Sequence, residues 1–269
     1  MILEKSIAFL KRDFLIESSY KMAFVLNFID SVFPVLLFYF VGKLMVGNES
    51  NGLEKYGGEY FPFALVGIAF TRYFQMAIDV FTSTMRRAQM VGCLEAILSS
   101  QSNPKSVVLF SSIYSFISAG VQLVFMFIIA ALFLGFSFSN VNILPSILAV
   151  VLSIILFISL GIFSASGTII FKKGEPFGWF FGTLSALFGG AFFPIEVMPD
   201  WMQAISIIVP ITYSLEALRL TILQGHSILM VSNHLIILGS MSLVLFPLSL
   251  KTFQWAVEKG KRDGSLMDY

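Results

Sequence analysis

The sequence has 269 residues, of which 57% are hydrophobic and only 12% are charged. An ordinary soluble domain carries about 25% charged residues, so this composition excludes a soluble protein and favours a chain embedded in a membrane. The few charged residues lie between apolar runs and form no basic patch, so we expect no nucleic-acid partner; the formal net charge of +1 gives no indication of one. The single Cys93 excludes a disulfide framework, and His226 and His234 are too few and too far apart to predict a metal centre.

The first 21 residues predict an amphipathic helix. Apolar residues recur there at helical spacing with charged side chains between them: Leu3, Ile7, Leu10 and Phe14. Such a helix lies at the cytoplasmic face of the membrane, either as a plain anchor for the next helix or as a moving part. Charges at positions 11–13 interrupt any apolar run of a secretory signal peptide, so we expect none to be cleaved.

Six segments are long and apolar enough to cross the hydrocarbon core, which needs roughly 20 residues of helix. They cover residues 22–46, 61–81, 107–136, 143–171, 177–193 and 231–250. The sequence therefore predicts an all-α membrane protein with a six-span domain over residues 22–250 and a cytoplasmic tail over residues 251–269.

Lys and Arg residues concentrate before the first of these spans and after the second, fourth and sixth. Cytoplasmic loops of membrane proteins carry such an excess of positive charge. We therefore expect both termini in the cytoplasm and the chain in the plasma (inner) membrane.

Two segments between spans have unusual composition. Residues 83–103, on the cytoplasmic side, carry an apolar stripe that predicts either a short docking helix or a plain connecting loop. Residues 194–227, on the outer side, are too apolar for an exposed loop and are interrupted by Pro199 and Pro210. We expect two short helices there that dip back toward the bilayer.

Asp30 and Arg72 are charged residues at similar depth in the first two spans. Because an unpaired charge near the bilayer centre costs roughly 2.5–3.5 kcal/mol, we expect the two to pair, or to share a polar cavity, inside the protein. A structural pair that locks two helices is favoured over a proton or ion relay, because no third buried ionisable group continues a path.

Two motifs on opposite sides of the membrane resemble those of the type-2 ABC export permease family. The first runs from Gly189 to Trp201 and resumes from Val209 to Arg219, with a Phe-Phe-Pro turn, a Pro-x-Trp segment and a Pro-x-Thr-Tyr segment. The second covers residues 86–100 and is similar to the family's Gly-Thr-Leu-Glu-Ala-Leu-Leu coupling segment, with Cys93 in place of the usual Thr.

The resemblance implies half of a transporter. Two copies of this chain, or one copy and a close paralogue, would form the pathway, and two ATP-binding subunits would dock beneath them. ATP and magnesium would bind to those subunits, since this sequence has no Gly-x4-Gly-Lys-Ser/Thr loop to hold ATP phosphates. We therefore expect no enzymatic activity in the chain itself.

The resemblance also implies roles for particular residues. Those that would couple to the ATPase are Arg87, Gly92, Cys93, Leu94, Glu95 and Leu98. Those that would form the outer gate are Phe193, Pro194, Pro199, Trp201, Pro210, Tyr213 and Arg219. The exported molecule would be a glycan or glycolipid, or an amphipathic drug-like compound. Two alternatives remain at this point: an ion-coupled secondary transporter that uses the Asp30–Arg72 pair, and a purely structural subunit.

Overall fold

The computed structural model describes residues 2–45, 52–90, 104–171 and 176–262. Within these ranges every regular element is a helix, which confirms the expected all-α class. The long helices are α1 (Ile2–Ser19), α2 (Lys21–Met45), α3 (Tyr60–Met90), α5 (Pro104–Phe133), α6 (Ile143–Phe171) and α10 (Ser232–Arg262). The shorter elements are η1 (Glu54–Tyr56), α7 (Pro176–Phe188), η2 (Ile195–Val197), α8 (Asp200–Ser206) and α9 (Pro210–Leu223).

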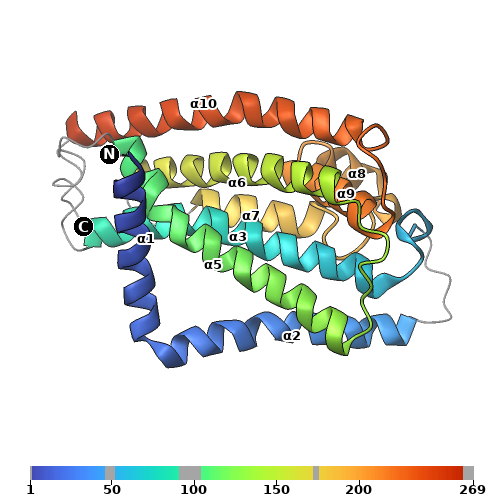
Figure 1. The fold of residues 1–269 in the computed structure, drawn as a ribbon. Helices are drawn as coiled ribbons and strands as arrows, with labels where there is room; N and C mark the ends of the chain where they lie inside the picture. Colours follow the sequence, from blue (N-terminus) through green and yellow to red (C-terminus); the bar gives the residue numbers. More distant parts are fainter. Residues whose placement is uncertain (1, 46–51, 91–103, 172–175, 263–269) are drawn as a thin grey trace.

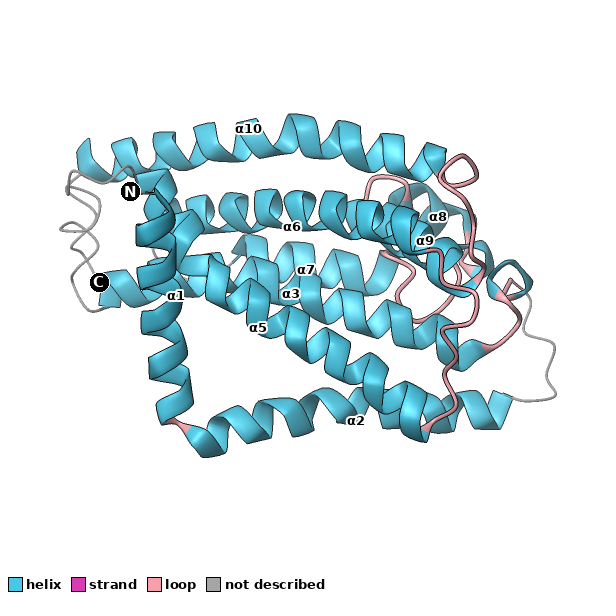
Figure 2. Cartoon of the chain, in the orientation of Figure 1, coloured by secondary structure: helices cyan, strands magenta, loops and turns pink. Residues whose placement is uncertain are grey.

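Most of the helices lie roughly side by side in one bundle (Figure 1). Helix α1 crosses one end of this bundle, and the start of α1 and the end of α10 both lie there. Helices α8 and α9 lie at the opposite end, where most of the described loops gather (Figure 2). We call these two ends the α1 end and the α9 end.

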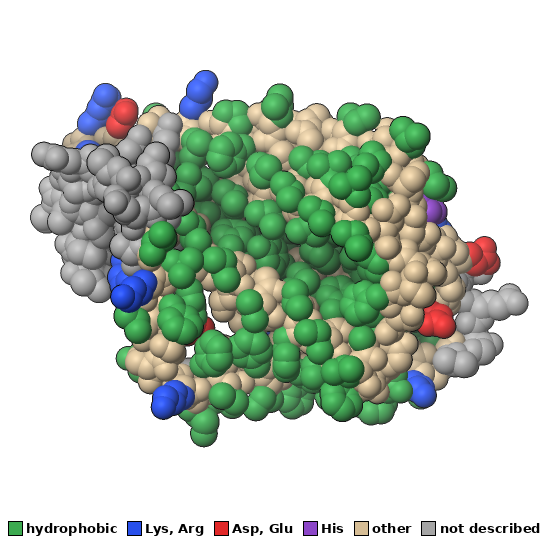
Figure 3. All heavy atoms as spheres, in the orientation of Figure 1, with side chains coloured by type: hydrophobic (Ala, Val, Ile, Leu, Met, Phe, Trp, Pro, Cys, Tyr) green, Lys and Arg blue, Asp and Glu red, His purple; other side chains and the backbone are tan. Residues whose placement is uncertain are grey.

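The surface of the bundle is apolar between its two ends. In the space-filling view, hydrophobic side chains cover the middle of the molecule, and charged side chains lie mainly toward the α1 and α9 ends (Figure 3). Five helices are long and apolar enough to cross a membrane, or up to six if the bent pair α8–α9 forms one further span. The protein is therefore a multi-pass membrane protein.

The core of the bundle forms around α3 and α6. Every residue from Phe63 to Phe70 on α3 is buried. One turn further along, the ring of Phe74 packs edge-on against Phe157 of α6, with centroids 4.8 Å apart. In contrast, Ser31 and Val35 are the only buried residues among those of α2 whose side chains are described. Helix α2 is thus peripheral within a single chain.

Helix α7 is shorter than the span expected at residues 177–193. It has 13 residues and ends at Phe188, so at about 1.5 Å per residue it is too short to cross a core of about 30 Å alone. The helix stops because Gly190 adopts a positive φ of 69°, a conformation that a glycine accepts without strain. The expected six-span layout is therefore not confirmed in this region, where α7 does not qualify as a span and the bent pair α8–α9 is the candidate for a sixth.

Two helices extend beyond their expected ends on the α1 side. Helix α3 continues through Met90, so residues 83–90 prolong a span instead of starting a separate docking helix. Helix α10 continues through Arg262, and residues 251–262 of the expected tail are helical.

Candidate functional site

Prolines shape the α9 end. Pro194 immediately precedes η2, Pro199 is the N-cap of α8, and Pro210 is the first residue of α9. Because proline fixes φ and lacks an N–H, it suits a helix start and interrupts a helix that precedes it. Helices α8 and α9 meet at an angle of 90°. The hydroxyl of Tyr213 donates to the carbonyl oxygen of Ile207 at 2.8 Å and closes this corner.

The aromatic residues expected in the outer gate lie on the surface of the chain. Trp201 is exposed, and its ring lies edge-on to that of Phe188, with centroids 6.2 Å apart. Phe193 is also exposed. The structure thus contains two short helices where the sequence predicts them. Their position relative to the bilayer and their gating role stay predictions.

Arg219 is the buried centre of the α9 end, with only 2% of its surface exposed. Its Nε donates to the carbonyl oxygen of Phe63 at 3.2 Å, while Nη1 and Nη2 donate to those of Gly190 and Ala191 at 2.7 and 2.8 Å. The guanidinium also lies over the ring of Phe63, 3.5 Å from its centroid. One side chain therefore fastens α9 both to α3 and to the turn that ends α7.

This arrangement requires a glycine at position 67 of α3. A Cβ atom added to Gly67 would lie 1.9 Å from the carbonyl oxygen of Ala191 and 2.5 Å from Nη2 of Arg219. The turn after α7 can reach the guanidinium only because α3 presents no side chain there.

A second group of polar residues surrounds Glu216, one turn before Arg219. The carboxylate of Glu216 accepts a hydrogen bond from the hydroxyl of Tyr56 at 2.5 Å and pairs with Lys55. Lys55 also lies 3.3 Å from Glu196 of η2. Element η1, which lies between α2 and α3 in the chain, is thereby held to α9 and η2 together.

The surroundings of Lys55 and Tyr56 favour the protonated form of both side chains. Burial by itself would lower the pKa of Lys55, but the carboxylates of Glu216 and Glu196 outweigh it and raise the pKa of the ammonium group. Burial, together with the negative charge of Glu216, raises the pKa of the Tyr56 hydroxyl well above its usual range. At neutral pH Lys55 is therefore charged and Tyr56 is a neutral donor.

Asp30 and Arg72 lie in contact. Nη2 of Arg72 is 2.6 Å from Oδ2 of Asp30, and Nη1 donates to the Asp30 carbonyl oxygen at 3.3 Å. The pair is not enclosed by this chain, however, since the side chains of Asp30 and Arg72 are 70% and 36% exposed. Helix α2 is too peripheral to bury them, which the spacing of charges along the sequence does not reveal.

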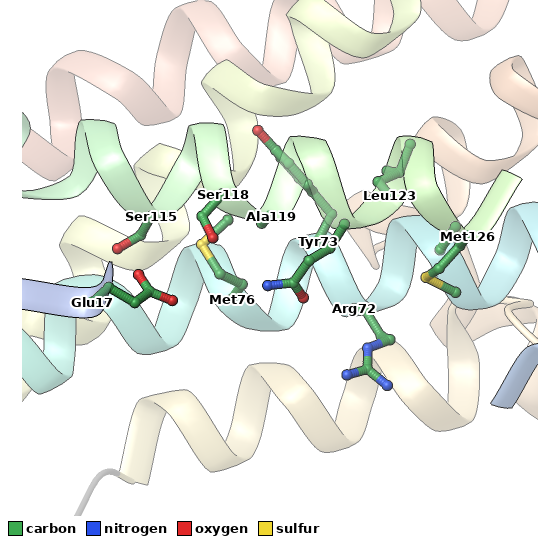
Figure 4. A pocket seen from close by; sticks show the side chains of 11 residues that line it. Glu17, Arg72, Tyr73, Met76, Ser115, Ser118, Ala119, Leu123 and Met126 are labelled. Atoms are coloured by element: carbon green, nitrogen blue, oxygen red, sulfur yellow. The ribbon is translucent and has the colours of Figure 1, made fainter. Parts of the chain in front are cut away.

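Arg72 lines two cavities. The first holds about 260 Å³ between α1, α3 and α5, and the second holds about 530 Å³ along α3. They share Arg72, Met76 and Ser115. Figure 4 shows the first cavity with Glu17, Ser115 and Ser118 near one end and Leu123 and Met126 toward the other.

The residues expected to couple to an ATPase lie almost wholly outside the described residues. Gly92, Cys93, Leu94, Glu95 and Leu98 fall within 91–103. The backbone of Arg87 belongs to the last turns of α3, and its side chain also lies outside what the structure describes. Their role stays a prediction.

Sequence reasoning missed Lys55, Tyr56, Glu196 and Glu216 at the α9 end and Glu17 beside the cavity. Glu216 lies within the motif that ends at Arg219, and its spacing of three residues from Arg219 on an apolar helix is a signal that could have singled it out. Among the described residues, no group of His, Cys, Asp or Glu side chains could hold a metal ion.

The comparison with protein families agrees with this architecture. The bundle of apolar helices defines a multi-pass membrane protein, and the ABC-2 type transporter family model matches residues 5–223 of the chain. The chain therefore belongs to the ABC-2 type transporter family, as the sequence motifs indicated. Its part in transport is that of the membrane subunit, which is not itself catalytic. A search of curated proteins gave no match.

Proposed function

We propose that this chain is the permease subunit of an ATP-driven exporter. Two copies, or one copy with a close paralogue, form the translocation pathway, and two separate ATP-binding subunits bind at the α1 end, which faces the cytoplasm of the plasma (inner) membrane. Closure of the ATP-binding subunits pushes on residues 92–98, and the helices shift between inward-open and outward-open packings. The bent pair α8–α9 forms the outer gate.

The observation that carries this proposal is the exposed Asp30–Arg72 pair. Asp30 lies nine residues after the start of α2, which is about 14 Å along the helix and therefore inside the hydrocarbon core. A charged pair in contact with lipid tails at this depth is strongly disfavoured. Water in a pathway, or a second copy of the chain, must therefore cover it.

Further polar residues of α3 extend from this pair toward the α1 end. Gln75, Asp79 and Ser83 follow Arg72 at spacings of three and four residues, which places all four on one face of α3. The same residues line the larger of the two cavities. A polar face within a spanning helix suits a route for molecules that cannot dissolve in lipid.

The polar face of α3 also indicates the chemical class of the exported molecule. Hydrogen-bonding groups along α3 adjoin the apolar surface of α2, so the route suits a molecule with a polar and an apolar part. A glycolipid or glycan and an amphipathic drug-like compound both fit this description.

Thiol labelling tests whether α3 lines a water-filled pathway. In a Cys93→Thr background, Gln75→Cys should react with a small membrane-impermeant thiol reagent. Leu243→Cys, at an exposed apolar position of α10, serves as the control and should not react. Addition of the ATP-binding subunit with ATP should change the rate at Gln75→Cys. Equal and negligible labelling at both positions would contradict the proposed route, and labelling unaffected by ATP would favour an ion-coupled carrier.

A further inference from the structure

The smaller cavity has an uneven distribution of polar and apolar side chains. Glu17 of α1 and Ser115 and Ser118 of α5 lie near one end, while Leu123 and Met126 lie toward the other (Figure 4). The space-filling view is hollowed in the area that α1, α2 and α5 enclose (Figure 3). Because α1 crosses the α1 end of the bundle, the polar end of the cavity lies nearest that end of the molecule.

The charges around the cavity do not cancel. Arg72 is balanced by Asp30, at 2.6 Å, and cannot also balance Glu17. Within the described part of the chain, no Lys or Arg lies within ion-pair distance of Glu17. The carboxylate of Glu17 therefore gives the polar end of the cavity a negative character.

The apolar part of the cavity can receive a hydrophobic body. Apolar side chains of both helices line it: Ala69 and Met76 of α3, and Leu123 and Met126 of α5, with Met76 lying nearer to Ser118 (Figure 4). Methionine side chains are flexible and polarizable, so they adapt to ligands of different shape. A volume of about 260 Å³ holds a small amphiphile, and the shared wall at Met76 gives a longer chain access to the adjoining cavity.

From these features we propose that the cavity between α1, α3 and α5 binds a cationic amphiphile, whose ammonium group pairs with Glu17 and whose apolar body lies against Leu123 and Met126. That such an amphiphile is also the exported molecule rests on the proposed function. That the cavity binds it does not. The hydroxyls of Ser115 and Ser118 accept hydrogen bonds from an ammonium that carries N–H groups.

The ammonium group can belong to an amphiphile that enters from the cytoplasm or to the headgroup of a membrane lipid such as phosphatidylethanolamine. Both present the same chemistry to Glu17. Competition between them distinguishes the two sources.

The test uses the purified full chain in a neutral maltoside detergent. Two fluorescent probes are titrated: a dansyl-labelled alkyl trimethylammonium and a dansyl-labelled alkyl alcohol of the same chain length. The variant Glu17→Gln removes the carboxylate charge. Its matched control is Asp13→Asn, which removes the same charge one turn away on α1. Asp13 pairs with Arg12 at 2.8 Å and does not line the cavity. Glu17→Asp retains the charge and should retain part of the affinity.

The expected result is selective. Glu17→Gln should weaken binding of the ammonium probe about tenfold, as for the loss of one charged contact, and leave binding of the alcohol unchanged. Asp13→Asn should change neither. Equal loss for both probes, equal effects of the two α1 variants, or no effect of Glu17→Gln would overturn the inference. Size-exclusion profiles and circular dichroism of each variant exclude a folding defect as the cause.

Two further results identify the source of the ammonium group and test the cavity separately from the exporter function. Displacement of the ammonium probe by phosphatidylethanolamine, but not by phosphatidylglycerol, assigns the site to a lipid headgroup, and no displacement assigns it to a free amphiphile. Selective binding without any associated ATPase would support the cavity and contradict the exporter. An ATPase that associates with a chain showing no charge-selective binding would do the reverse.

Discussion

At the scale of single residues, the α9 end depends on a cation that is bound by carbonyl oxygens. The planar guanidinium of Arg219 presents several N–H groups in fixed directions, and it reaches Phe63, Gly190 and Ala191 at once. A lysine is a point charge and cannot reproduce this geometry. Position 219 therefore requires an arginine for structural reasons, whatever part α9 has in gating.

Replacing Arg219 tests this requirement. Arg219→Ala leaves three buried carbonyl groups without their donors, so we expect the free energy of unfolding to fall by about 3 kcal/mol or more. Thermal unfolding of the purified chain, followed by tryptophan fluorescence, measures the change. Arg262→Ala, at the exposed end of α10, is the control and should have no effect. An Arg219→Ala chain as stable as the wild type would contradict this assignment.

Gly67→Ala should also lower the free energy of unfolding, in this case through a steric clash. Gly67→Ala forces the turn after α7 away from α3, and overpacking of this kind costs about 1–3 kcal/mol. Gly239→Ala makes the same change in α10, where no atom lies within 4 Å of the added Cβ, and it should be neutral or slightly stabilising. Comparison of the two unfolding temperatures checks the prediction, which fails if both variants behave alike.

At the scale of elements, η1 is held to α9 and η2 through Lys55 and Tyr56, two side chains that titrate at alkaline pH. Free lysine and tyrosine have pKa values of about 10.4 and 10, and in this structure the pKa values of Lys55 and Tyr56 are both raised. Their contribution to stability is therefore fully present below about pH 10 and is lost as the pH rises through the raised values.

The unfolding temperature should consequently fall more steeply above about pH 10 in the wild type than in a Lys55→Met/Tyr56→Phe variant. Between pH 7 and 9 the difference between the two chains should stay constant. Parallel curves over the whole alkaline range would show that these two groups do not hold η1.

The Asp30–Arg72 pair joins α2 to α3 and predicts a charge-swap effect. Asp30→Arg places two cations side by side inside the membrane, so we expect little folded protein in the membrane fraction. The double change Asp30→Arg/Arg72→Asp restores an opposite pair and should recover much of the yield. Asp30→Asn should retain transport if the pair acts as a structural lock, as we expect. Loss of transport in Asp30→Asn at normal yield would instead indicate a proton-coupling role.

Elements differ in how well the sequence predicts them. Long apolar runs define α2, α5 and α6 closely, because a spanning helix needs only local hydrophobicity. The apolar run does not show where α7 ends, because the helix stops at the positive φ of Gly190 and the following turn is held by Arg219, 28 to 29 residues further along the chain. The contacts of Glu216 with η1 join residues about 160 positions apart, and local patterns do not specify such pairs.

At the scale of the whole molecule, the membership in the ABC-2 type transporter family and the polar face of α3 support one account. The short helices of the α9 end are joined by buried hydrogen bonds and ion pairs, whereas α2 and the polar face of α3 are partly exposed within a single chain. An assembly of two chains with ATP-binding subunits at the α1 end would provide that cover. The central claim of this account is the coupling of the chain to an ATPase.

The most direct test is the ATPase activity of the ATP-binding subunit co-purified with this chain in lipid. Leu94→Asp and Glu95→Ala alter the expected coupling segment, and Glu258→Ala makes the same change as Glu95→Ala at an exposed position near the end of α10. The account predicts that an ATPase co-purifies, that Leu94→Asp or Glu95→Ala releases or uncouples it, and that Glu258→Ala does neither. Absence of any associated ATPase, or activity unchanged by both coupling variants, would contradict the account.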